Sequence, residues 1–167
     1  MDYKYGFKET GQLNTAKASV LSLPISYKQS VEVCKYIKGK NLSVAMTELG
    51  QVVEGVKAIP YTRFNRGGTG HKTNIGPGRY PIKTSAAIIK VLDDVKQNAK
   101  NKGLDLGKLT ILHIAANKGA KSYHYGRKRR RLMKRTHIEV VVAEKQPHKK
   151  ERAKAPVKQD AVKQGEK

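Results

Sequence analysis

The chain has 167 residues, and its 35 Lys and Arg against 13 Asp and Glu give a formal net charge of +22. This length is enough for one ordinary domain and a tail. The charge favours a polyanionic partner, with nucleic acid the first choice and an anionic membrane surface the second. One cysteine cannot form an internal disulfide, which is typical of a reducing compartment. Because no apolar run resembles a membrane helix or a signal region, we expect a soluble intracellular protein.

The N-terminal part of the chain predicts an arm, a strand and two helices. Residues 1–15 are polar and contain Gly, so we expect an irregular arm. Residues 16–25 are apolar enough for a strand, which Pro24 confines to a sheet edge or to the end of the strand. Helices are predicted over 27–38 and 44–54. Each is followed by a glycine suited to a left-handed C-terminal cap, namely Gly39 and Gly55.

Serine residues stand at both expected helix starts. Ser26 and Ser43 are preferred N-cap residues. For Ser43 this role explains the run Asn41-Leu42-Ser43 better than a glycosylation site does. On the first helix, the spacing predicts that Val31, Cys34 and Ile37 face the core. The same spacing predicts a polar stripe of Lys28, Glu32 and Lys35.

Residues 57–81 differ in composition from the rest of the chain. Their prolines and glycines exclude a regular element, and the segment contains cations but no acid. Its aromatic residues are Tyr61, Phe64 and Tyr80. Cations interleaved with aromatic rings suit phosphate contact together with stacking on unpaired bases. A solvated linker is the alternative. The Gly-rich run at 67–73 lacks the pattern of a phosphate loop, because His71 precedes Lys72 and no apolar strand precedes the run.

A third helix and a hairpin are predicted in the second half. Residues 83–102 carry a wide apolar face of Ala87, Ile88, Val91, Leu92, Val95 and Ala99, and Gly103 ends the helix. Residues 109–116 and 136–142 each have the length and β-branched content of a strand. In the second of these, Ile138, Val140 and Val142 share one face.

The segment between the two hairpin strands, 118–135, contains nine Lys or Arg and no Asp or Glu. A core cannot accept so many unpaired cations, so the segment must leave the body and meet an anionic partner. If both halves of this segment stay extended, the segment protrudes roughly 30 Å from the body of the domain. Within it, Arg127, Arg129 and Arg131 would then face one way, and Lys128 and Arg130 the other. A nuclear-localisation role for residues 127–131 stays open.

Nothing in the sequence resembles an active site. The five histidines lack metal-ligand spacing, and Asp93 and Asp94 are adjacent on a helix and point in different directions. Cys34 is expected to be a packing residue. We therefore expect no enzymatic activity, no cofactor and no metal. Residues 145–167 are rich in Lys, Gln and Ala with few large apolar residues, so we expect a disordered basic tail.

Several motifs, in this order, resemble those of the universal large-subunit ribosomal protein twenty-two family in its archaeal and eukaryotic form. They are Ile25-Ser26-Tyr27-Lys28, Gly78-Arg79-Tyr80-Pro81, His113-Ile114-Ala115-Ala116-Asn117-Lys118-Gly119 and Thr136-His137-Ile138-Glu139-Val140. The resemblance covers roughly residues 13–144. The tip departs from it, because it is shorter and lacks the family run resembling Pro-Arg-Ala-x-Gly-Arg-Ala. The departure leaves open how far the tip reaches.

The expected fold is α+β, with three helices on a small antiparallel sheet and a protruding basic hairpin at about 108–144. Residues 1–144 would form a single rRNA-binding domain. The resemblance implies a structural constituent of the large ribosomal subunit whose hairpin lies along the peptide exit tunnel. The expected partners are large-subunit rRNA, neighbouring ribosomal proteins and a nascent peptide at the tip, in the cytoplasm. The alternative is a free-standing architectural DNA- or RNA-binding protein with a β-ribbon arm.

The residues expected to contact rRNA are mostly cations. They come from the segment 57–81, which we call the loop, from the helix ends and from the hairpin. They are Lys28, Lys38, Lys40, Arg63, Arg66, His71, Lys72, Arg79, Lys83, Lys118, Lys121, Arg127, Lys128, Arg129, Arg130, Arg131, Lys134, Arg135 and His137.

Overall fold

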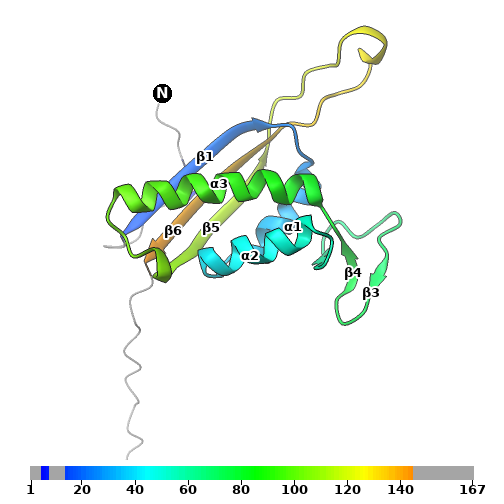
Figure 1. The fold of residues 1–167 in the computed structure, drawn as a ribbon. Helices are drawn as coiled ribbons and strands as arrows, with labels where there is room; N and C mark the ends of the chain where they lie inside the picture. Colours follow the sequence, from blue (N-terminus) through cyan, green and yellow to red (C-terminus); the bar gives the residue numbers. More distant parts are fainter. Residues whose placement is uncertain (1–4, 8–13, 145–167) are drawn as a thin grey trace, which may run out of the picture.

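The computed structural model describes residues 5–7 and 14–144, and the expected tail at 145–167 lies outside these residues, as does most of the expected arm. Its main sheet has three antiparallel strands in the order β1-β6-β5. They are β1 (Thr15–Leu23), β5 (Leu109–Lys118) and β6 (Thr136–Glu144). Helices α1 (Tyr27–Ile37), α2 (Leu42–Val53) and α3 (Ile82–Asn101) lie against this sheet (Figure 1). The predicted α+β fold is confirmed.

Strand β6 is the centre of the sheet because it pairs with β1 on one side and with β5 on the other. The predicted apolar face of Ile138, Val140 and Val142 is fully buried against the helices. The opposite face is also buried at Glu139 and Val141. There the Gly6 N–H donates to Glu139 Oε2 at 3.1 Å, so the described part of the N-terminal arm covers this side of the sheet.

The helices bury the faces that their periodicity predicts, with small differences. On α3, the residues Ile88, Val91, Leu92, Val95 and Ala99 are buried, whereas Ala87 is half-buried. On α1, Cys34 and Ile37 are buried, but Val33 takes the central place expected for Val31, which is half-buried. Burial of the Cys34 thiol raises its pKa to about 12. This residue therefore serves packing, as expected.

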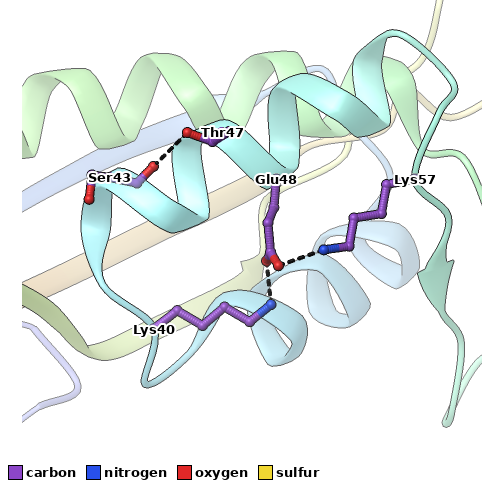
Figure 2. Close-up of polar contacts among 5 residues, drawn as sticks. All are labelled: Lys40, Ser43, Thr47, Glu48 and Lys57. Carbon is purple, nitrogen blue, oxygen red and sulfur yellow. Dashed lines mark hydrogen bonds and ion pairs between the residues drawn. The ribbon is translucent and has the colours of Figure 1, made fainter.

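The predicted N-cap position is confirmed for Ser26 and wrong for Ser43. Ser26 occupies the N-cap position of α1, but its side chain makes no capping hydrogen bond. Helix α2 begins at Leu42 after Asn41, so Ser43 lies inside the helix, where its carbonyl oxygen accepts a hydrogen bond from Thr47 Oγ1 at 3.1 Å (Figure 2). The C-terminal prediction is confirmed at Gly39, which has a φ of +80° and donates its N–H to the Ile111 carbonyl.

The expectation that 57–81 contains no regular element is wrong. Strands β2 (Ile59–Pro60), β3 (His71–Lys72) and β4 (Gly76–Arg79) form a second small antiparallel sheet in the order β2-β4-β3. Prolines are tolerated here because the strands are very short. Pro77 has no N–H, but its carbonyl accepts a hydrogen bond from the Tyr61 N–H at 2.8 Å.

The hairpin is a regular ribbon only as far as the pair Lys118↔Thr136. Beyond it, Gly119 passes so close to Arg135 that an added Cβ would lie 3.0 Å from the Arg135 Cβ. The tip then holds one isolated bridge, Tyr123↔Leu132, and the single 3-10 turn η2 (Gly126–Lys128), followed by a turn at 129–130. Residues 127–131 are therefore not extended, and their predicted alternation between two faces is wrong.

Candidate nucleic-acid interface

The two basic segments leave the domain at the same end, with the hairpin at the upper right and the small sheet at the lower right of Figure 1. Helix α1 begins between them. A pocket of about 390 Å³ joins the three elements, since its lining includes Lys28 of α1, Arg66 of the loop and Lys134 of the hairpin. This end of the molecule is the strongest candidate for a polyanion-binding surface.

The cations of the hairpin tip are presented to solvent. Lys118, Lys121, Lys134 and all of 127–131 are exposed, whereas Arg135 is half-buried with its Nη2 3.4 Å from the Met133 sulfur. Two aromatic side chains accompany them: Tyr123 is 63% exposed and Tyr125 is 89% exposed. The contact residues predicted from the sequence are all cations or histidines and include neither tyrosine. Two tyrosines that closely precede the five consecutive cations 127–131 are the signal that could have identified them.

Glu32 holds the basic loop in place, which contradicts its predicted position on a polar stripe. Its side chain is 1% exposed. Its Oε1 accepts the backbone N–H of Arg63 at 2.8 Å and of Phe64 at 2.7 Å, and its Oε2 accepts that of Thr62 at 3.3 Å. These bonds position the loop backbone so that Arg63 and Arg66 point into solvent. The helical period could not show this role, because the donors lie about 30 residues away in sequence.

The three loop aromatics have different environments. Tyr61 is 2% exposed, so its predicted stacking on an unpaired base is wrong. Phe64 is half-buried against the core, with Lys28 Nζ 5.8 Å and Arg63 Cζ 5.3 Å from its ring centroid. Tyr80 is exposed and lies beside Lys72, whose Nζ is 5.6 Å from the ring centroid. Of the three, Tyr80 is the ring that remains accessible to a base.

Three predicted contact residues also have partners within the protein. His137 Nδ1 accepts a hydrogen bond from the Ser22 N–H at 3.0 Å, and Arg79 donates to Thr69 Oγ1 at 3.2 Å and to the Gly67 carbonyl at 2.9 Å. Lys40 pairs with Glu48 and lies over the Tyr36 ring. The exposed cations Lys28, Lys38, Lys83, Arg63, Arg66 and the exposed His71 remain open to solvent.

Figure 2 shows Glu48 of α2 between Lys40 and Lys57, with a Lys57 Nζ–Glu48 Oε1 distance of 2.6 Å. Burial alone would raise the pKa of Glu48, but the hydrogen bonds from Lys40 and Lys57, together with their charges, lower it below the usual value. This carboxylate therefore joins the turn before α2, which carries Lys40, to the segment after α2, which carries Lys57.

Glu48→Gln should lower the free energy of unfolding by about 1 kcal/mol at pH 7, the range of partly exposed ion pairs. Because the folded-state pKa of Glu48 is lowered, its contribution is present above its ordinary pKa of about 4.5 and is lost as the pH falls through the folded value. Urea unfolding of the variant and the wild type between pH 3 and 7 measures the difference. A gap that persists unchanged at pH 3 would contradict this origin.

Within residues 5–7 and 14–144, no group of three or more His, Cys, Asp or Glu is placed to hold a metal ion. The described helices include none that is both long and apolar enough to cross a bilayer. His113 of β5 has its Nε2 2.9 Å from Glu139 Oε1. It is therefore part of the sheet's own polar contacts.

Known proteins match most of this chain. Large ribosomal subunit protein uL22 of Thermofilum pendens is 38% identical over 136 residues, covering 78% of this chain and 89% of its own length. The uL22 proteins of Sulfolobus acidocaldarius and Nanoarchaeum equitans are 39% and 41% identical over 140 residues each, covering 77% and 78% of this chain and 89% and 79% of their own lengths. The profile of the family described as ribosomal protein L22p/L17e matches residues 18–143. This chain therefore belongs to the ribosomal protein L22p/L17e family.

Proposed function

We propose that this protein is a non-enzymatic, structural constituent of the large ribosomal subunit in the cytoplasm, where it binds large-subunit rRNA and neighbouring ribosomal proteins. The observation that carries the proposal is that the hairpin and the loop both project from the same end of a domain of this family. Because the basic hairpin and the basic loop belong to one folded domain, they can hold separate RNA segments at a fixed spacing. Family membership supports this function over that of a free-standing architectural protein.

The mechanism of binding is charge neutralisation combined with shape. Exposed Lys and Arg of the hairpin and the loop displace the counterions of RNA phosphates, and this displacement supplies most of the affinity. The exposed rings of Tyr80, Tyr123 and Tyr125 can stack on bases that are unpaired. A narrow two-stranded ribbon also fits between RNA helices where a globular surface cannot.

The finer part of the proposal concerns the tip. We propose that residues 118–135 extend along the peptide exit tunnel and meet the nascent peptide there. The support is the family membership and the projection of this segment beyond the sheet. Crosslinking from a photoreactive residue at position 125 to a stalled nascent chain tests this part separately from rRNA binding.

Co-sedimentation with ribosomal subunits tests the overall proposal. The tagged full-length protein, expressed in cells, should sediment with large subunits at moderate salt and be absent from small subunits. Recovery with bulk DNA or RNA and not with large subunits would contradict the ribosomal assignment and favour the free-standing alternative.

The loop cations give a quantitative prediction. Replacing Arg63, Arg66 and Lys72 with Ala should weaken RNA binding and flatten its salt dependence, because each lost phosphate contact lowers the log–log slope by ~0.7–0.9. Arg79 is excluded because its side chain supports the loop through Thr69 and Gly67. The control replaces three exposed lysines of α3, namely Lys90, Lys96 and Lys100. Equal slopes for the two triple variants would show that the loop cations make no special contact.

A further inference from the structure

The pocket between α1, the loop and the hairpin has a strongly cationic lining. Its walls include Lys28, Arg63, Arg66, Arg79 and Lys134. Among the described residues, no Asp or Glu lines it. Glu32 is the carboxylate that holds this loop, and its oxygens are already engaged by loop N–H groups. Five cations against the single carboxylate of Glu32 favour an anionic occupant.

The start of α1 adds to the positive potential. Ser26 and Gln29 also line the pocket, and the Ser26 side chain makes no capping hydrogen bond. The first turn of α1 contains no acidic residue. N–H groups at an uncapped helix start carry partial positive charge and suit an anion.

An independent observation comes from Tyr61, which lines the same pocket. Its ring is 2% exposed, and its buried hydroxyl has no hydrogen-bond partner in the described structure. A buried hydroxyl left unpaired costs about 1–3 kcal/mol, so such a group is expected to find a partner in the working complex. Burial raises the pKa of Tyr61 to about 12, so at neutral pH the hydroxyl is protonated and can donate.

The Arg79 guanidinium is fixed before any ligand arrives. Its Nε and Nη2 donate to Thr69 and to the Gly67 carbonyl, and its Cζ lies 5.8 Å from the Tyr61 ring centroid. An arginine has five N–H donors, so these two bonds leave donors for an anion. A donor set that is already ordered loses little entropy on binding.

We propose that this pocket binds one nucleotide of single-stranded RNA by its phosphate group, and that this phosphate links the hairpin leg at Lys134 to α1 and the loop. The proposal rests on the RNA-binding function proposed above and names the part of the RNA that this surface takes. The pocket volume of about 390 Å³ is in the range of small-molecule sites, larger than a bare phosphate requires.

The test uses the full-length ¹⁵N-labelled protein with two probes, a five-nucleotide oligouridine and inorganic phosphate. Oligouridine should shift the amide signals of residues 26–29 and the Arg79 Nε signal. Inorganic phosphate should shift the same signals only at concentrations at least about tenfold higher, because it gains nothing from sugar and base. Equal affinity for the two probes would overturn the assignment to an RNA nucleotide.

Tyr61→Phe is the decisive variant because it removes only the hydroxyl. It should weaken oligouridine binding at the pocket signals about tenfold, the loss of one hydrogen bond to a charged group. It should leave the free energy of unfolding unchanged or slightly higher, since it removes an unpaired buried group. Tyr36→Phe, at a tyrosine of α1 that does not line the pocket, is the matched control and should leave the pocket signals unaffected.

The outcomes separate this inference from the proposed function. If oligouridine binds only through tip signals, or if Tyr61→Phe binds as the wild type does at residues 26–29, the pocket assignment is wrong while RNA binding stands. If the protein binds no RNA and does not sediment with large subunits, the proposed function itself fails, and the pocket assignment fails with it.

Discussion

Glu32→Ala should lower the free energy of unfolding by about 3 kcal/mol, because it removes the acceptor for three backbone N–H groups of the loop. Two of these bonds are 2.8 Å or shorter, and the side chain is 1% exposed, so water cannot replace the carboxylate without rearranging the loop. The measurement is urea unfolding at pH 7.

The functional consequence of Glu32→Ala should be confined to the loop. Amide exchange of residues 62–64 should rise well before global unfolding, and RNA affinity should fall because Arg63 and Arg66 lose their fixed positions. Glu54→Ala is the matched control, since Glu54 is an exposed carboxylate that ends α2. A loss below about 0.5 kcal/mol, or exchange at 62–64 equal to the wild type, would show that Glu32 does not anchor the loop.

Regular periodicity made the helices and the sheet predictable. The apolar spacing on α3 and the β-branched runs of β5 and β6 hold in the structure, because burial of one face dictates the pattern locally. The ends of elements were less predictable. Ser43 satisfies the N-cap preference, yet Asn41 is the N-cap residue and α2 begins at Leu42, two residues before the predicted start at 44. The Leu42 side chain is buried, and this burial outweighs a capping bond worth about 1 kcal/mol.

The candidate site depends on contacts between distant segments, which periodicity does not encode. Glu32 occupies a position that a helical wheel assigns to solvent, and only the folded loop shows that it is buried. The composition of the segment around Tyr61 suggests a ring that stacks on bases. Only the packing of β2 against β4 shows that this ring is buried within the protein. The tip cations were predictable because high charge density alone excludes them from a core.

Replacing residues 120–134 with an Asn-Gly turn should abolish most RNA affinity while changing the free energy of unfolding by less than about 1 kcal/mol. The replaced segment contains no buried residue, and the pair Lys118↔Thr136 can still close the ribbon. It does contain seven cations, so the log–log salt slope should fall by up to roughly 5 at ~0.7 per phosphate contact. Filter binding to large-subunit rRNA at several salt concentrations gives the slope.

A second variant separates charge from reach, because a shortened hairpin loses both. It keeps the full tip and replaces the same seven cations with Gln, so the ribbon can still enter a gap in the RNA but cannot neutralise phosphates. If charge supplies the affinity, this variant should show the same reduced slope as the shortened hairpin.

Competition against wild type for assembled large subunits then isolates the contribution of reach. The Gln variant should incorporate better than the shortened one, since Tyr123 and Tyr125 remain exposed for stacking. Wild-type salt dependence in the Gln variant would place the phosphate contacts on the loop and would remove the tip from the interface.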